Sequence, residues 1–203
     1  MRSRPATARA RTEPSAARAR AAGTRPAPPV RPVRLDRRDR LVLGFSLLST
    51  GLLAGAFGYG AANLVPTFDA VPIGTRLEFH SALMKRNSVT MQAAMAASVL
   101  GALALAALTR GRDRVLAAAA GLSALASFLI TRFGNVPING RIKRWAATAP
   151  PPDHAEVLRR WELFHHARTL TAVAAFALLV LLALRPGATR PPARTDPGGG
   201  AAE

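Results

Sequence analysis

Four long apolar runs constrain the fold of this chain more than any other feature of its sequence. None of the four contains Asp, Glu, Lys, Arg or His; they lie at residues 41–64, 89–108, 115–130 and 170–184. A helix needs roughly 20 residues to cross about 30 Å of hydrocarbon, so the two shorter runs must continue into their flanks. Lipid offers the backbone no hydrogen-bonding partners, which restricts such spans to helices. We therefore predict an all-α fold, a bundle of four transmembrane helices.

The positive charge of the chain lies mainly outside these runs. Residues 1–40 are rich in Arg, Ala and Pro, and residues 185–203 are rich in Pro and Gly. Neither segment holds enough apolar surface to order itself, so we expect disordered tails on both sides of a membrane domain at residues 41–184. The Arg-rich tail favours anionic lipid headgroups as partners, beside the bilayer itself. No aromatic interleaving or recognition motif accompanies the net charge of +17, so nucleic acid is not an expected partner.

The distribution of basic residues predicts the orientation. With the N-terminus inside, 18 of the 28 Lys and Arg residues fall on the inner side of the membrane. Positive residues favour the cytoplasmic side. The sequence therefore predicts a multi-pass protein of the cell membrane with both termini in the cytoplasm. In the first run, Gly44, Gly51, Gly55 and Gly58 form a small-residue stripe, which is typical of close helix packing.

The loops predicted at residues 65–88 and 131–169 emerge on one side of the membrane. They carry all four histidines of the chain: His80, His154, His165 and His166. In the second loop, Pro137 favours an extended Val136 and so predicts that the third helix ends near Asn135. Asn139 is then placed to cap a short helix over residues 140–147. This pattern predicts short interfacial helices between the third and fourth spans.

A further helix is expected to begin at Asp153, because Asp153 and Glu156 have the spacing of a capping box. We expect it to run unbroken into the fourth span. On this helix Trp161, His165 and Arg168 are spaced by four and three residues, so they share one face. The stripe lies where the helix enters the membrane, facing the mouth of the bundle.

Several of these motifs together resemble a known family. Between the third and the last span the chain reads NVPIN, then a tryptophan, then RRWELFHHART. This pattern resembles the DUF1772 family of four-helix membrane proteins, which is related to anthrone oxygenases. GYGAANLVPTFDAVP and FHSALMKRNSVTMQA look like that family's first loop and second helix. The resemblance covers residues 41–184, and many members carry Glu-His-Pro where this chain has Asn63, Leu64, Val65 and Pro66. It implies the four-helix fold and leaves the activity open.

The alternative to a membrane protein of undetermined activity is a cofactor-independent oxygenase acting on an aromatic polyketide such as an anthrone. Imidazole titrates near neutral pH, so His165 would remove a proton to give a carbanion that reacts with O₂. Arg168 would hold the developing oxyanion, and Asn135 or Asn139 would add a neutral donor. Trp161 would stack on the substrate, and His80 completes the candidate binding residues.

Two other hypotheses concern the same residues. In the first, His165 and Arg168 only connect the last helix to the N-x-P-x-N turn and to headgroup phosphates. In the second, histidines would bind a metal. His165 and His166 are adjacent on a helix and point to different faces, so they cannot both ligate. His80 and His165 could meet, but no clear carboxylate accompanies them, so no metal site is predicted. Transport across the bilayer is not expected either, because the four runs contain no charged residue.

Overall fold

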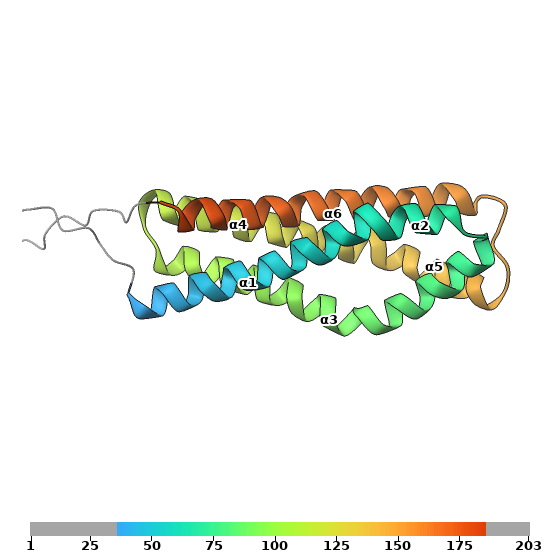
Figure 1. The fold of residues 1–203 in the computed structure, drawn as a ribbon, viewed down its shortest axis with the longest axis horizontal. Helices are drawn as coiled ribbons and strands as arrows, with labels where there is room; N and C mark the ends of the chain where they lie inside the picture. Colours follow the sequence, from blue (N-terminus) through green and yellow to red (C-terminus); the bar gives the residue numbers. More distant parts are fainter. Residues whose placement is uncertain (1–35, 186–203) are drawn as a thin grey trace, which may run out of the picture. The chain divides into compact units, whose positions relative to one another are not determined.

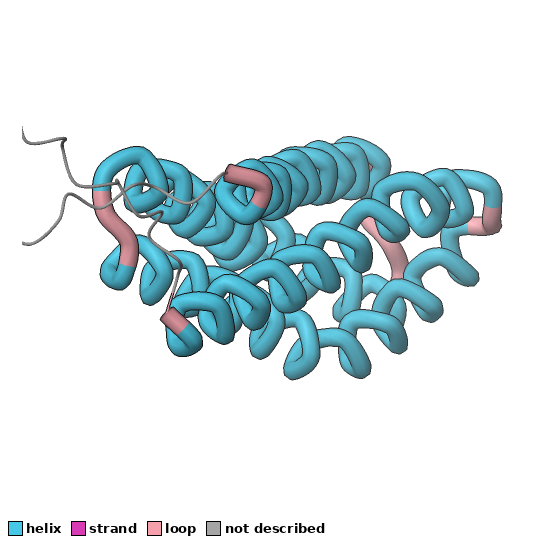
Figure 2. The backbone as a smooth tube through the Cα atoms, turned by 60° about the vertical axis from the view of Figure 1, so that its left-hand side comes forward, coloured by secondary structure: helices cyan, strands magenta, loops and turns pink. Residues whose placement is uncertain are grey.

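Four helical rods make up the part of the chain that the computed structural model describes, residues 36–185 (Figures 1 and 2). The tails expected at residues 1–40 and 185–203 lie outside this range, apart from residues 36–40 and Arg185. Two of the rods contain a five-residue π-helical segment, written η. In order, the elements are α1 Arg37–Tyr59, η2 Gly60–Leu64, α2 Val65–Ala70, α3 Ile73–Leu108, α4 Gly111–Ile130, η3 Thr131–Asn135, α5 Val136–Ala147 and α6 His154–Ala183.

Each rod is long and apolar enough to cross a membrane: Arg37–Ala70, Ile73–Leu108, Gly111–Ala147 and His154–Ala183. The predicted all-α bundle of four spans is thereby confirmed, and the chain is a multi-pass membrane protein. α6 packs along α4 and α1, while α3 packs along the other sides of α1 and α4. Large apolar residues on these rods remain exposed, such as Leu100 at 66% and Leu170 at 71%, as expected for a face in contact with lipid.

The two polar loops predicted on one side of the bundle are mostly helix. α2 continues α1, and only Val71 and Pro72 separate it from α3. In the third rod, the expected break at Pro137 and the separate interfacial helices are wrong, because Val136 is helical (φ −60°, ψ −44°) and α5 continues α4 through η3. Wide π turns rearrange the backbone hydrogen bonds, and Pro137 stands in the first turn of α5, where a missing N–H costs little.

Two capping predictions are also wrong. Asn139 lies inside α5 instead of before it, so its side chain is free for tertiary contacts. Asp153 does precede α6, but its side chain makes no capping bond, and Glu156 pairs with Arg159 instead. The continuous helix from this point into the fourth span is confirmed.

Close helix packing occurs at glycines other than most of those predicted. A Cβ atom at Gly44, Gly55 or Gly58 would meet nothing within 4 Å, and only Gly51 of that stripe contacts another helix. A Cβ at Gly121 of α4 would come within 2.8 Å of Leu103 on α3, so this glycine allows α3 and α4 to approach closely. Which glycines face a neighbour depends on the rotation of each helix in the bundle, which the stripe alone does not fix.

Candidate functional site

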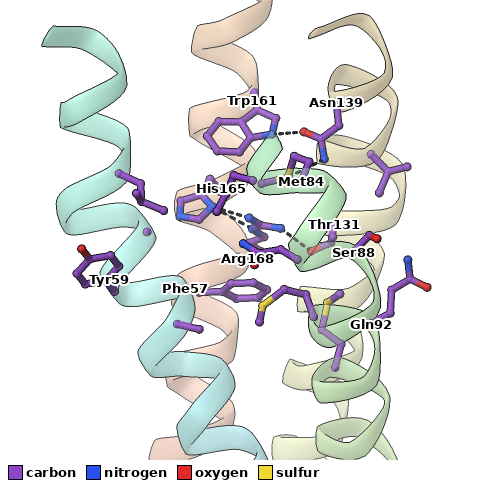
Figure 3. Close-up of a pocket in the computed structure, with 18 of the residues that line it drawn as sticks. Phe57, Tyr59, Met84, Ser88, Gln92, Thr131, Asn139, Trp161, His165 and Arg168 are labelled. Carbon is purple, nitrogen blue, oxygen red and sulfur yellow. Dashed lines mark hydrogen bonds between the residues drawn. The ribbon is translucent and has the colours of Figure 1, made fainter. Parts of the chain in front are cut away.

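A cavity of about 620 Å³ lies between the four rods, near the level of the two π-helical segments (Figure 3). α1 and η2 form one wall, the middle of α3 another, and η3 with α5 and α6 the rest. More than half of the lining side chains are apolar or aromatic, and eight of the 21 lining residues are polar or charged, Lys143 and Arg168 among them. Cavities of this size and composition are typical of sites for small ligands.

Two of those polar groups, His165 and Arg168, lie one helical turn apart on α6. Arg168 donates from Nε and Nη2 to Nδ1 of His165, at 3.1 and 2.7 Å. A guanidinium can only donate, so Nδ1 accepts with its lone pair and a neutral imidazole carries its proton on Nε2. In this arrangement, His165 orients Arg168, and its basic nitrogen is already engaged.

The guanidinium of Arg168 has no carboxylate partner within residues 36–185. Its other contacts are a long bond to Thr131 Oγ1 at 3.5 Å and the ring of Phe57, whose centroid lies 4.3 Å from Cζ. Arg168 is only 8% exposed. Buried charges in proteins are normally paired. The Arg168 cation contacts only an aromatic ring, a hydroxyl and an imidazole among the described residues, so it can bind an anion in the cavity.

Gly60 of η2 makes room for the His165 ring. A Cβ atom at Gly60 would lie 2.8 Å from His165 Nε2 and 2.9 Å from Cε1, which is too close for any side chain larger than hydrogen. Nε2 itself is buried and has no hydrogen-bond partner among the described residues. A face of the imidazole stacks on Trp161, with centroids 5.3 Å apart and the planes at 10°. The ring is therefore held between η2 and α6.

Asn139 joins Trp161 to two elements of the bundle. Its Oδ1 accepts from Trp161 Nε1 at 2.8 Å and lies 3.2 Å from His80 Nε2. An indole N–H can only donate, which fixes the amide orientation and places the His80 proton on Nε2. The Nδ2 of Asn139 then faces Met84 Sδ at 3.4 Å. The amide thus ties α5 to α6 and α3, and His80 Nδ1 remains buried without a partner within the described residues.

The two π-helical segments stand on either side of the cavity. η2 lines it with Gly60 and Leu64, and η3 with Thr131. Each segment is followed by Val-Pro, at Val65-Pro66 and at Val136-Pro137. π turns in helices recur at functional sites, because the wider turn displaces backbone and side chains from their α-helical positions. Here they widen two rods where the cavity needs space.

A second polar cluster lies beyond the aromatic layer, outside the cavity. Arg76 of α3 bonds Asp69 of α2 and Glu162 of α6, both at 2.6 Å. Its guanidinium also lies 5.6 Å from the ring centroid of Phe68, which in turn stacks on His80. This cluster fastens α2 and α3 to α6 and so supports the wall that carries Trp161.

The structure places the predicted site residues unequally. Trp161, His165, Arg168 and Asn139 line the cavity, whereas His80 packs behind Trp161, and Asn135 donates from Nδ2 to the Trp161 carbonyl at 3.0 Å. His154 bonds the Pro151 carbonyl, and His166 is exposed. Sequence reasoning missed four contributors to the site: Phe57, Gly60, Thr131 and Arg76. Val-Pro follows each wide turn but also occurs at Val71-Pro72, where no π-helical segment precedes it, so this dipeptide alone would not have identified η2.

The comparison with known families matches the region that carries most of this site. A sequence model of the anthrone oxygenase family covers residues 79–178, from the first turns of α3 to near the end of α6. No curated protein and no solved structure matches the chain. The matched stretch includes His80, Asn139, Trp161, His165 and Arg168. Over residues 79–178 the resemblance inferred from the motifs is thereby confirmed, and the chain is an anthrone oxygenase-like membrane protein of the DUF1772 type.

Proposed function

We propose that this membrane protein is a cofactor-independent oxygenase that acts on a planar, enolisable aromatic ketone of the anthrone class. The observation that carries the proposal is the buried Arg168 guanidinium, which lines an apolar cavity without a carboxylate partner in residues 36–185. An enolate is an anion on an apolar frame, so it matches both the charge and the lining. The cavity of about 620 Å³ lies within the usual range for ligands of this size.

The reaction needs no group beyond the substrate and O₂. Removal of the proton at the activated C–H gives the enolate, whose carbanion form combines with O₂ to a hydroperoxide. Loss of water from the protonated hydroperoxide leaves the quinone, so that anthrone and O₂ give anthraquinone and water. Protein groups need only bind the aromatic, stabilise the negative oxygen and take up a proton.

Arg168 and His165 would act in sequence. Before substrate binds, the Arg168 N–H groups occupy Nδ1 of His165. The polar carbonyl oxygen of a bound substrate would draw the guanidinium away from His165, so that Nδ1 is free to accept the C–H proton. Arg168 would then stabilise the negative charge that this transfer places on the same oxygen. Trp161 holds the imidazole in place, because the indole stacks on the ring of His165. Asn139 fixes the indole, and its own NH₂ group contacts Met84, another lining residue of the cavity.

O₂ uptake and quinone absorbance, recorded together on the purified chain in lipid nanodiscs with an anthrone substrate, test the proposal. We expect equal amounts of O₂ consumed and quinone formed. His165→Gln keeps a hydrogen-bonding side chain and should retain the fold, while the rate falls by roughly 10²–10⁴. Arg132→Gln, an exposed arginine of η3 outside the cavity, is the matched control and should stay active.

The opposite result favours the structural alternative. If the wild-type chain consumes no O₂ with any enolisable aromatic, and His165→Gln is merely less stable, then His165 and Arg168 connect helices and nothing more. The headgroup contacts that this alternative assigned to Arg168 find no support in its burial.

The same proposal includes a location. We place the chain in the cell membrane with both termini in the cytoplasm, which sets the cavity toward the outer half of the bilayer. The distribution of Lys and Arg supports this orientation, as does the Arg-rich segment 1–40, which would contact anionic headgroups of the inner leaflet.

A further inference from the structure

We infer that the cavity opens sideways into the bilayer, between the α1–η2 rod and the middle of α3, and that it takes its ligand from the membrane. The ligand class is then a lipophilic, membrane-dissolved molecule. The inference concerns the same cavity as the proposed oxygenase but depends on none of its chemistry.

The rim of the cavity is exposed on these two rods, and also on α5 through Val136 and Lys143 on the other side of α3. Ala56 and Tyr59 of α1 and Ser88 and Gln92 of α3 all line the cavity and are all exposed; Tyr59 reaches 62%. Figure 3 shows Tyr59 and Gln92 on opposite sides of the cavity. In Figure 1, α3 begins next to α2 after the Val71–Pro72 turn, and the middle of α3 then lies apart from the rod formed by α1, η2 and α2. The exposed lining residues of α1 and α3 are the ground for placing the opening between these two rods.

The depth of this rim is that of hydrocarbon. Ala56 and Tyr59 lie within the apolar run 41–64, and Gln92 lies four residues inside the run 89–108. Ser88 marks the edge of that run, next to the basic residues that precede it. Because lipid chains surround a rod at this depth, an opening between two rods there communicates with lipid before it communicates with water.

Two features of α3 suit this side of the cavity for the passage of a ligand. Gln92 is an amide inside an apolar run, exposed and without a hydrogen bond to any described residue. Such a group is costly in lipid unless a partner reaches it, and a ketone or phenol that passes the rim supplies one. Met84, Met91 and Met95 line the same wall. Methionine side chains are flexible and adapt to irregular shapes, so they can make way for a planar ligand.

The first test measures which medium reaches the rim. The chain has no cysteine, so single nitroxide labels are attached at Ala56→Cys and Gln92→Cys of the full chain in nanodiscs. Collision with lipid-soluble O₂ is compared with collision with a water-soluble nickel chelate. Leu100→Cys serves as the hydrocarbon reference and Glu78→Cys as the aqueous reference, both at exposed positions of α3.

We expect both rim labels to behave like the label at Leu100, with high O₂ and low nickel accessibility. Nickel accessibility equal to that at Glu78 would overturn the inference, because the mouth would then open to water. This readout involves no turnover. If the rim labels are in lipid but the protein consumes no O₂, the oxygenase proposal is refuted and the opening to lipid stands. If the rim labels are exposed to water in a protein that consumes O₂, the opening to lipid is refuted and the oxygenase proposal stands.

The second test narrows the opening. Ala56→Phe adds a ring at the rim, and Ala93→Phe adds the same ring at an exposed position of α3 outside the cavity. Binding of 1,8-dihydroxyanthraquinone is followed by quenching of Trp161 fluorescence in a Trp145→Phe background, because the chain has two tryptophans. We expect Ala56→Phe to slow association by about tenfold with little change in affinity, and Ala93→Phe to match the wild-type rate. Equal association rates for the two variants would contradict a portal at this place.

Discussion

Replacement of Gly60 by alanine tests the packing on which the site depends. A Cβ at this position would lie 2.8 Å from His165 Nε2, while the stacked indole of Trp161 restricts how the imidazole can move. The ring has to shift, and the bonds from Arg168 to Nδ1 shift with it. Forcing an extra methyl group into a packed interior costs about 1–3 kcal/mol. Alanine recovers roughly 1 kcal/mol over glycine through its helix propensity.

Gly58→Ala is the matched control, since a Cβ there would meet nothing within 4 Å. Both variants share the gain in propensity, so the difference between them isolates the steric cost. That difference of about 1–3 kcal/mol corresponds to melting temperatures roughly 3–10 °C apart for a domain of this size. Circular dichroism in detergent measures the melting, and Trp161 emission, recorded in a Trp145→Phe background, reports the displaced ring. Equal melting temperatures with unchanged emission would refute the packing described for His165.

Three further predictions concern other parts of the molecule. A reporter that is active only outside the cytoplasm should give no signal when fused after Leu184 or in the turn at Gly111; a strong signal from the first fusion would reverse the orientation. Arg76→Met should lower stability by about 1–2 kcal/mol, because it leaves Glu162, 19% exposed, without its cation, and adding Glu162→Gln should restore part of the loss; no recovery in the double variant would argue against the ion pair. Asn139→Leu should cost about 1–3 kcal/mol and change Trp161 emission in the same Trp145→Phe background, since the indole N–H loses its acceptor; unchanged emission would contradict that bond.

The parts of the site that local spacing determines were predictable from the sequence. Trp161, His165 and Arg168 share a face of α6 because positions three and four residues apart always do so in a helix. The four spans follow equally directly from the length of the apolar runs. Both features depend on neighbours in the chain and hold in any tertiary arrangement.

The features that depend on contacts between rods were not predictable in this way. Pro137 usually marks a helix end, but here a π turn and the surrounding helices accommodate it. Gly60 gave no local sign of its contact with His165, which lies on a different rod. Arg76 and Glu162 are 86 residues apart in the chain, and nothing in either segment indicates the pairing. The local sequence predicts a capping role for Asn139, whereas its actual contacts depend on where Trp161 lies in the bundle.

The central claim, that Arg168 stabilises an oxyanion inside an apolar cavity, is tested most directly by the ionisation of a bound phenol. 1,8-Dihydroxyanthraquinone changes its visible absorption when a phenol ionises, so it is titrated with pH in nanodiscs bearing wild-type or Arg168→Gln protein. We predict that the wild-type protein lowers the pH of half-ionisation of the bound phenol by at least about one unit relative to Arg168→Gln, equivalent to about 1.4 kcal/mol. Identical titrations for the two proteins, with the phenol bound in both, would contradict the claim.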